Sequence, residues 1–494
     1  MDAGTFFPFI DIYGQYAHGD WPAKIHSDAD LKQARAKEDA ELAASKRPAD
    51  WDRFGGWATG PRLKATGSFR TEKYEGKWYF VDPDGRLFFS QGLDVLIAHT
   101  DATRSGGHES WFAFPVTSAT LPFTDWNLRK KYGTADYEPA FYATLSKRLE
   151  HWGINSIGDW GKPALITLGR TPYTLQLTDY NPDLPRIAGG KLKFYDVFDP
   201  AYIKAMQTLV ATAATRNPAV TKSLTDPMCI GYFIDNELNF GNRGRQTLVD
   251  DILRSPATQA AKQEFARDLK ARYATIEKLN RAWGSHYADW DALLAETGSV
   301  PSSKGYKADS DTFFRKTVDQ YFRLCRDAIK SVAPDRLYLG CRFISTDAVR
   351  KDLYDASRKY CDVLTTNVYA HSVANFAGEG FPDMPVLIGE FHFGILDRGM
   401  FSSGVVNAGI TQRERALAYI RFVQGALVHP NIVGTHWFQL RDQPLTGRWD
   451  GEGYEIGFVD VADTPYEELT HAAREIGETM YRYRSRGKLV DSPE

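Results

Sequence analysis

Residues 228–239, MCIGYFIDNELN, decide the fold of this chain. Their first part, residues 229–234, is a continuous apolar run of the length expected for a strand that is buried on both faces. The run ends abruptly in Asp235, Asn236 and Glu237, an acid, an amide and a second acid. Polar residues directly after a buried strand are typical of the carboxyl-terminal rim of a parallel barrel, where functional side chains gather.

A second stretch has the same form. Residues 385–393, PVLIGEFHF, are an apolar strand with Glu390 near its end. Two glutamates at the ends of two buried strands predict a pair of carboxyl groups that face one pocket. Glycoside hydrolysis uses such a pair, one to protonate the leaving oxygen and one to meet the oxocarbenium-like carbon. We therefore expect Glu237 and Glu390 to be the catalytic pair, although a carboxylate at a helix N-terminus is the simpler reading of Glu237 alone.

Strands and helices alternate around these two stretches, which predicts an α/β fold, a (β/α)8 TIM barrel. Its long insertion after strand 4, residues 238–310, is expected to shape a substrate groove. A doubly wound sheet would need a Gly-rich turn after strand one, and QGLDVL, residues 91–96, is not one. The expected strands are 86–96, 153–159, 173–179, 229–234, 337–343, 362–369, 385–393 and 432–439. The expected helices are 141–152, 200–215, 258–273, 276–283, 311–332, 347–360, 414–428 and 464–483.

Three regions are expected along the chain. Residues 1–85 form an N-terminal extension and a small β-rich cap, with a helix at 29–46 and a hairpin at 69–89 around two turn signals. This cap is too short to bury a core of its own, so it should pack on the barrel. Residues 86–485 form the catalytic barrel, and residues 486–494 a C-terminal tail.

Further candidate site residues fall at or near the predicted strand ends. Asn236 can hydrogen-bond the sugar hydroxyl beside the scissile carbon, and Tyr369 can donate its hydroxyl to the nucleophile. Trp437 could form the floor under the sugar, and Trp160 a stacking platform on a loop. Packing at the rim or in the core is the alternative for each. The remaining candidates for sugar binding are Asp94, Asp159, Asp179, Arg342, His371, His392, His436, Gln439 and Arg441.

Composition excludes several classes of function. The net charge of −3 over 494 residues favours neither nucleic acid nor an anionic membrane as a partner. The four cysteines form no CxxC motif, and no HExxH motif accompanies Glu390 and His392, so we expect neither a metal site nor a cofactor. The N-terminus has no signal-peptide pattern and no window approaches 18 apolar residues. A cytoplasmic protein or a mature periplasmic or secreted form fits, and nothing indicates an oligomeric state.

Four segments resemble glycoside hydrolase family 50, the β-agarases, which belong to the retaining clan A barrels. They are FFPFIDIYGQYAHGDWPAKIHSDADL at 6–31, KYEGKWYFVDPDGRLFFSQGLDV at 73–95, GYFIDNEL at 231–238 and VLIGEFHFG at 386–394. The segment EKLNRAWGSHYADW at 277–290 also resembles one in family 42 β-galactosidases.

The resemblance implies cleavage of β-1,4-galactosidic bonds in agarose or agaro-oligosaccharides, with exo release of neoagarobiose. It also implies the two roles that chemistry alone leaves open, acid/base for Glu237 and nucleophile for Glu390. Two alternatives stay open: a β-galactosidase that acts on small β-galactosides, and a catalytically silent carbohydrate-binding barrel.

Overall fold

The structure is a computed structural model that describes residues 3–99, 102–242, 246–344, 351–376 and 381–486. The tail expected at 486–494 therefore lies, apart from Arg486, outside the described residues.

Within these residues, nine strand segments form one parallel sheet in the order β12-β9-β8-β7-β4-β16-β15-β14-β13. The two ends of this sheet, β12 (Leu337–Tyr338) and β13 (Phe343–Ile344), come from one short stretch of chain. The sheet therefore curls round until both its edges are supplied by residues 337–344, which is the arrangement of a TIM-like α/β fold. The other strands are β4 (Ser90–Leu93), β7 (Ser156–Ile157), β8 (Tyr173–Gln176), β9 (Cys229–Phe233), β14 (Leu364–Asn367), β15 (Val386–Phe391) and β16 (Ile432–Trp437).

The predicted parallel α/β sheet is confirmed, and its three longest strands have no solvent face. Every residue of β9, β15 and β16 is buried, since helices cover the outside of the sheet and side chains fill the inside. Gly231 lets two strands approach closely: a Cβ there would lie 2.5 Å from the Leu337 carbonyl oxygen.

The helices lie close to their expected positions, with two differences. The helix expected at 200–215 is two helices, α6 (Pro200–Gln207) and α7 (Leu209–Arg216). Thr208 separates them, with its hydroxyl bonded back to the carbonyls of residues 204 and 205, a contact that competes with helix geometry. Helix α13 (Lys304–Lys330) begins seven residues before its expected start at 311, because the Ser303 hydroxyl caps the Tyr306 N–H. The remaining helices of the sheet layer are α4 (Glu138–His151), α5 (Pro163–Ile166), α8 (Pro218–Ser223), α14 (Lys351–Tyr360), α15 (Gln412–Val428) and α16 (Glu467–Arg486).

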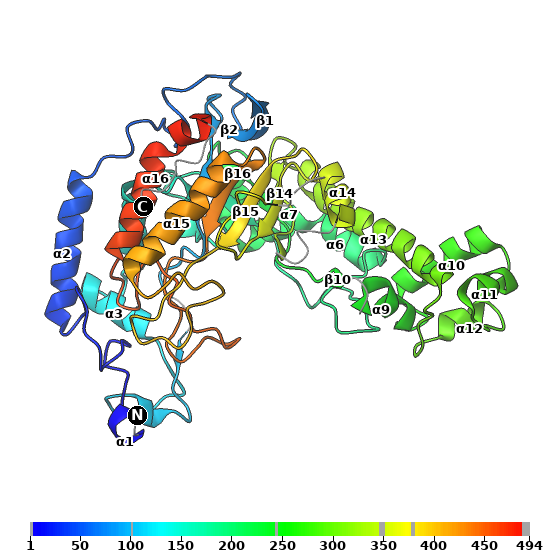
Figure 1. The fold of residues 1–494 in the computed structure, drawn as a ribbon, viewed down its shortest axis with the longest axis horizontal. Helices are drawn as coiled ribbons and strands as arrows, with labels where there is room; N and C mark the ends of the chain where they lie inside the picture. The colour runs from blue at the N-terminus through cyan, green and yellow to red at the C-terminus, as the bar shows by residue number, and fades with distance from the viewer. Residues whose placement is uncertain (1–2, 100–101, 243–245, 345–350, 377–380, 487–494) are drawn as a thin grey trace.

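The insertion after β9 is a helical arm that projects from the sheet beside α13 (Figure 1). A short hairpin, β10 (Gly241–Asn242) and β11 (Gln246–Thr247), leads into it. Its helices are α9 (Leu248–Arg254), α10 (Ala260–Tyr273), α11 (Ile276–Trp283) and α12 (Trp290–Ala295). The buried carboxylate of Asp309 on α13 ties the arm down, because it accepts hydrogen bonds from the Tyr273 hydroxyl and the Trp283 indole, each at 2.8 Å.

The N-terminal region contacts two sides of the sheet. Helix α2 (Asp28–Ala44) runs along the outside, and an antiparallel sheet of β1 (Arg70–Tyr74), β2 (Lys77–Val81) and β3 (Leu87–Phe88) lies at one end (Figure 1). Phe80 and Phe88 of this small sheet belong to one buried cluster with Ile230, Phe233, Leu337, Leu339, Val363, Leu387 and Val433 of the parallel sheet. The short elements α1 (Ala3–Phe6), β5 (Thr103–Arg104), η1 (Glu109–Trp111), β6 (Thr120–Leu121) and α3 (Phe123–Tyr132) complete the described structure.

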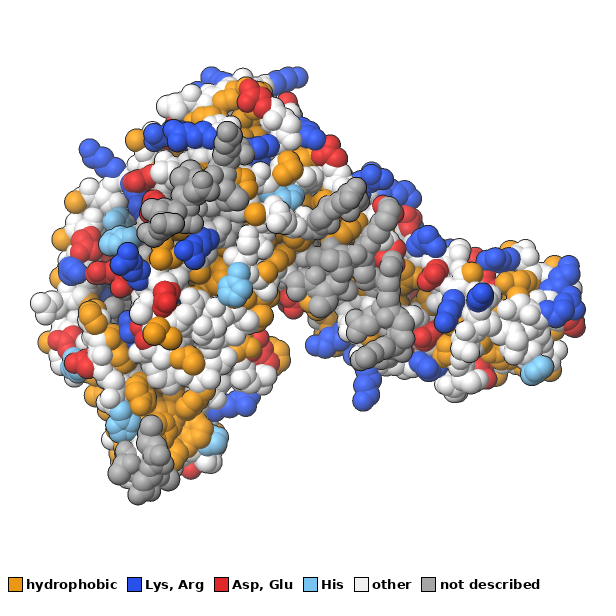
Figure 2. All heavy atoms as spheres, viewed as in Figure 1, with side chains coloured by type: hydrophobic (Ala, Val, Ile, Leu, Met, Phe, Trp, Pro, Cys, Tyr) orange, Lys and Arg blue, Asp and Glu red, His pale blue; other side chains and the backbone are white. Residues whose placement is uncertain are grey.

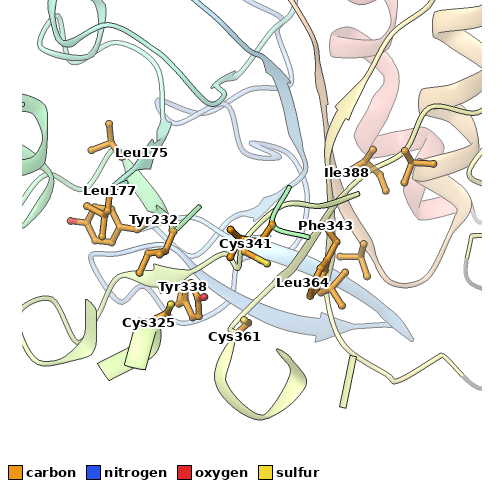
Figure 3. Packing of buried hydrophobic residues seen from close by; sticks show 14 of the residues in the cluster. Leu175, Leu177, Tyr232, Cys325, Tyr338, Cys341, Phe343, Cys361, Leu364 and Ile388 are labelled. Atoms are coloured by element: carbon orange, nitrogen blue, oxygen red, sulfur yellow. The ribbon is translucent and has the colours of Figure 1, made fainter. Parts of the chain in front are cut away.

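The cysteines are part of the apolar core. All four are free and buried, and Figure 3 shows Cys325, Cys341 and Cys361 close to Tyr338 in that core. They pack as small hydrophobic side chains, as their positions in the sequence indicate. None of the helices in the described part of the chain is long and apolar enough to cross a lipid bilayer.

Candidate active site

Glu237 lies directly after β9, where the chain turns away from the sheet. Its φ angle of 52° is left-handed, and its N–H donates to the Arg342 carbonyl at 3.1 Å. The Asn367 amide donates to Oε1 of the Glu237 side chain at 2.8 Å. Burial and the nearby charge of Glu390 raise the pKa of Glu237 to about 7, so this carboxyl group keeps its proton up to neutral pH.

Glu390 lies on β15 and is 5% exposed. The Arg342 guanidinium donates to Oε1 at 2.7 Å and the Tyr369 hydroxyl donates to Oε2 at 2.5 Å. Each carboxylate oxygen therefore has one donor, and the two donors fix the orientation of the carboxylate. The preceding Gly389 makes room for the neighbouring strand, because a Cβ there would lie 2.8 Å from the Asn367 side-chain oxygen.

Arg342 connects the two acids. Besides Glu390, its guanidinium donates to the Asn236 amide oxygen at 2.9 Å. Asn367 pairs with Glu390 in the register of β14 and β15 and donates to Glu237. The two carboxyl groups thus belong to one cluster whose members come from the ends of four different strands, as expected at the carboxyl-terminal rim of such a sheet.

Arg342 faces more negative charge than it can neutralise. Its guanidinium lies 3.0 Å from Asp94, 3.5 Å from Asp159 and 2.7 Å from Glu390, and Arg342 and the two aspartates are fully buried. Burial raises the pKa of Asp94 well above its usual value and that of Asp159 to about 7. Burial also lowers the pKa of the adjacent His436 to about 3, so this ring is neutral. Burial therefore opposes ionisation of both aspartates, and Glu390 is the acid that lies nearest to the Arg342 guanidinium.

These contacts give the two glutamates different surroundings. Glu237 is neutral below pH about 7, whereas Glu390 is held by a cation and a hydroxyl. A proton donor beside a carboxylate is the arrangement used for acid-assisted displacement at an acetal carbon. A cavity of about 240 Å³ opens nearby and is lined by Val95, Ile97, His99, Gln439, Gln443, Pro444 and Arg448.

Four of the predicted site residues lie against this cluster or its cavity. Asn236 and Tyr369 contact it directly through Arg342 and Glu390. Trp160 is half-buried, and the Arg342 guanidinium lies 4.9 Å from its ring centroid. Gln439 is 3% exposed and lines the cavity, with its amide donating to the Arg441 carbonyl.

Asp179 and His371 are exposed at a greater distance from the acids. Asp179 bonds the Tyr180 N–H at 2.7 Å, and its charge raises the pKa of Asp159, which places it near the buried cluster. His371 stacks on Phe393 with ring centroids 6.2 Å apart. Within the described residues, neither side chain forms a hydrogen bond with Glu237 or Glu390.

The expectation that Asp94, Arg342, His392 and Trp437 bind substrate needs correction. Each is at most 1% exposed, so none presents a surface to a sugar. Asp94 and Arg342 support the acids from beneath. His392 lies behind Tyr369 with ring centroids 4.7 Å apart. Trp437 points into the core, and its indole donates to the Ile456 carbonyl at 2.8 Å; a strand end alone does not reveal on which face a side chain lies.

Two residues of the site were not among the predictions. Asn367 is the last residue of β14, two positions before Tyr369, and its place at a strand end beside that predicted residue is the signal that could have identified it. Phe438, the neighbour of Trp437, is 8% exposed and lies beside two of the predicted site residues. Its ring lies between Trp160 and His392, with centroids at 6.2 and 6.4 Å.

No group of three or more His, Cys, Asp or Glu side chains among the residues with described positions is arranged to hold a metal ion.

Known proteins resemble this chain in sequence over nearly its whole length. Beta-agarase B and Beta-agarase A of Vibrio sp. (strain JT0107) are 32% and 33% identical to this chain, over 98% and 97% of its length. The matches cover 55% and 52% of those proteins, so the chain spans about half the length of the curated relatives it matches. A family model described as Beta-galactosidase, Glyco_hydro_42, matches residues 200–382.

Solved structures agree over nearly the whole chain. One solved structure, that of an exo-beta-agarase, is 31% identical to this chain in sequence and has a TM-score of 0.88. The match covers 99% of this chain and 75% of the exo-beta-agarase chain. The structure of PfGH50B is also 31% identical with a TM-score of 0.88, over 99% of this chain and 76% of its own. The curled parallel sheet with its helices is the TIM-like α/β fold of a clan of glycoside hydrolases. Within that clan, the chain belongs to glycoside hydrolase family 50, which confirms the resemblance found in the sequence.

Proposed function

We propose that the protein is a retaining glycoside hydrolase that cleaves β-1,4-galactosidic bonds of agarose or agaro-oligosaccharides, acting from chain ends to release neoagarobiose. The observation that carries this proposal is the asymmetry of the acid pair. The pKa of Glu237 is raised to about 7, while Glu390 in the same cluster accepts from Arg342 and Tyr369. The names of the relatives, beta-agarases and an exo-beta-agarase, support the substrate class.

In the proposed mechanism, a carboxylate oxygen of Glu390 attacks the anomeric carbon while Glu237 gives its proton to the departing glycosidic oxygen. Glu237, now ionised, then takes a proton from the water that hydrolyses the glycosyl ester, so that both acids return to their starting states. Arg342 and Tyr369 orient the attacking carboxylate. Asn236, held by Arg342, presents its amide group to the hydroxyl beside the reacting carbon.

The proposal extends to the organisation of the chain. Residues 86–485 act as a complete (β/α)8 catalytic barrel, residues 1–85 as an extension and cap packed on it, and residues 486–494 as a tail. The helical arm after β9 forms one wall of the substrate groove. The substrate is the only partner proposed, with no cofactor.

Chromatography of the products from agarose and neoagarotetraose over time tests the reaction. We expect neoagarobiose from the first time points, and no fall in mean chain length before it accumulates. Glu390→Ala should abolish turnover, and azide should restore some with an inverted product. Azide rescue of Glu237→Ala should give a retained product. Glu475→Gln, an exposed glutamate on α16, is the matched control and should leave rates unchanged.

One observation favours a second candidate, a β-galactosidase that acts on small β-galactosides: the match of residues 200–382 to the Beta-galactosidase family model. Fast turnover of an aryl β-galactoside with no product from agarose would select this candidate. Binding of agaro-oligosaccharide without any turnover would instead select the silent carbohydrate-binding barrel.

A further inference from the structure

Four segments that are distant in sequence form a lobe beside the active site. They are residues 6–21, the 103–121 hairpin, the 396–410 loop after β15 and the 443–454 loop after β16; together we call them the aromatic lobe. They share a small core of their own, built from Phe9, Ile10, Phe112, Leu121, Phe123, Met400 and Leu445. Backbone bonds from Phe9 and Ile10 to the Trp111 carbonyl, both 2.9 Å, join the first two segments.

The outer face of this lobe carries rings held from beneath. Phe401 is 60% exposed and Phe7 36% exposed, and Trp111 is half-buried between them. The buried ring of Phe9 supports them, with centroids 5.6 Å from Phe401, 5.3 Å from Trp111 and 5.8 Å from Phe7. The Phe7 and Trp111 planes differ by only 20°. Figure 2 shows hydrophobic side chains gathered at the tip of the molecule near the N-terminus, with histidines beside them.

The same lobe concentrates exposed apolar side chains in its two loops. Leu396, Val405, Ile410 and Trp449 are 51%, 57%, 82% and 74% exposed, in addition to Phe401. Single exposed hydrophobic residues are ordinary, but a cluster of them on neighbouring loops marks a binding surface.

The loops that carry these side chains are joined to the reacting groups. The Val405 N–H donates to Nε2 of His392 at 2.9 Å, and His392 packs on Tyr369, the hydroxyl donor to Glu390. The two loops meet in a bridge between Ser402 and Tyr454. The loop that carries Phe401 is therefore bonded to a buried residue that packs against Tyr369 of the acid cluster.

We propose that Phe7, Trp111 and Phe401, with Trp449, form a secondary binding surface for a neutral polysaccharide chain, separate from the sites that hold the reacting sugars. This inference rests on the proposed function. Phe7, Trp111 and Phe401 are rings that contact one another, and ring faces stack on the C–H faces of sugars. A chain that reaches the acids must continue across one wall of the site, and this lobe is such a wall.

The test compares long and short substrates. In Phe401→Ala and Trp449→Ala, KM for agarose rises about threefold to tenfold for each ring lost, while kcat and KM for neoagarotetraose stay unchanged. Phe401→Tyr, which keeps a ring, retains the wild-type KM for agarose. Leu168→Ala and Val332→Ala, at exposed apolar positions outside the lobe, are matched controls and leave both substrates unaffected.

A binding measurement keeps this inference separate from the reaction. Co-sedimentation of Glu390→Gln with insoluble agarose should weaken when Phe401→Ala and Trp449→Ala are added, whether or not the wild type releases neoagarobiose. Unchanged sedimentation overturns the proposal. So does an equal loss on agarose and neoagarotetraose, which would place the rings at the reacting sugars. A change of mass in light scattering for Phe401→Ala would overturn it in favour of contact with a second copy of the chain.

Discussion

Several residues at the rim of the sheet hold backbone conformations that their side chains disfavour. Asp235, Glu237 and Arg342 have φ angles of 63°, 52° and 51°, and Val95 and Trp160 have 55° and 57°. Left-handed φ angles cost non-glycine residues of order 1–3 kcal/mol each and persist where surrounding contacts impose them. All five follow or end strands around the acid cluster. The backbone strain is therefore concentrated around the acid cluster, and strained residues commonly cluster at functional sites.

Arg342 is the residue on which the cluster depends most. In Arg342→Met, three buried or nearly buried carboxyl groups lose their cation, so the free energy of unfolding should fall by about 3–5 kcal/mol. The loss of orientation at Glu390 should lower kcat/KM by about 10²-fold or more. Urea unfolding and turnover of neoagarotetraose measure the two effects. Adding Asp94→Asn removes one uncompensated acid, so the double variant should regain stability but not activity. Recovery of activity would contradict the role given to Arg342.

The alkaline limb of the pH profile should report Glu237, the proposed proton donor. With its pKa at about 7, kcat/KM should fall as pH rises above neutrality. The charge of Glu452 raises this pKa and the Asn367 amide lowers it. Glu452→Gln should therefore shift the limb to lower pH and Asn367→Ala to higher pH. Shifts of the same sign in both variants would show that another group controls the limb.

Stability should depend on pH through the same residue. The pKa of a glutamate in an unfolded chain is about 4.3, below the value of about 7 in the folded protein. The folded state therefore binds the proton more tightly, and wild-type stability relative to Glu237→Gln should fall as pH rises from about 4.3 to about 7. Melting temperatures of both proteins at four or five pH values measure this difference. A difference that does not change across that window would contradict the raised pKa.

The sequence predicted the two acids as a pair but not what holds them. An acid at the end of an apolar run, as at Glu237 and Glu390, is visible locally, because burying a lone charge is costly. The contacts of Arg342 with Asp94, Asp159 and Asn236 join residues far apart in the chain, and no local pattern reports them. Trp437 shows a second reason: it and Phe438 are equally aromatic in sequence, and only the path of the strand end decides which one faces the site.

Between elements, the strongest link is a buried group of charges. Glu38 of α2, Lys131 of α3 and Arg148 of α4 meet Asp463 in the loop before α16, where Arg441 also bonds. Asp463 and Arg148 have no exposed side-chain surface. Burial opposes ionisation of Asp463, yet the charges of Arg148, Lys131 and Arg441 hold its pKa well below the usual value. This group fixes the N-terminal helix to the outer helices of the sheet.

Removing the central acid should loosen that link. Asp463→Asn keeps the shape and tolerates the left-handed φ angle of 61°, but it leaves three cations with Glu38 alone. We expect the free energy of unfolding to fall by about 3–5 kcal/mol. Because the folded pKa lies below the unfolded value of about 3.9, this contribution should be constant above pH about 5 and disappear only as pH falls below about 4.

The exposed pair Arg35–Asp39 on α2 is the matched control for that measurement. The two side chains are 30% and 51% exposed, so Asp39→Asn should cost at most about 0.5 kcal/mol. Equal effects of Asp39→Asn and Asp463→Asn in urea unfolding would show that the buried group adds nothing to stability.

The elements themselves were largely predictable. Strands that are buried on both faces are continuous apolar runs, and the eight expected runs all contain strands of the observed sheet. What the sequence did not show was local hydrogen bonding at helix ends. The Thr208 hydroxyl splits the helix expected at 200–215, and the Ser303 cap extends the next one towards the arm. Both effects are worth about 1 kcal/mol, too little to stand out from the apolar pattern.

At the scale of the whole molecule, the small N-terminal sheet fills the end of the parallel sheet that is opposite the catalytic rim. Phe80 and Phe88 are fully buried and lie in one cluster with Phe233, Leu387 and Val433. The Trp78 N–H also donates to the Pro430 carbonyl at 2.7 Å, just before β16 begins. The inside of the parallel sheet is therefore completed by side chains from the region expected to form a cap packed on the barrel.

This packing predicts that residues 1–85 cannot be removed. A shortened chain that begins at Arg86 would expose the apolar ends of β9, β15 and β16 to water, and we expect it to be insoluble or without a cooperative unfolding transition. In Phe88→Ala of the full chain, the free energy of unfolding should fall by about 3–5 kcal/mol. The kcat/KM for neoagarotetraose should stay unchanged, because Phe88 lies at the end of the sheet opposite the acids. Lys73→Ala, in the outer strand of the same small sheet, should change neither quantity. A soluble chain from Arg86 that unfolds cooperatively and turns over substrate would show that the parallel sheet closes its own core and that the N-terminal region is an independent addition.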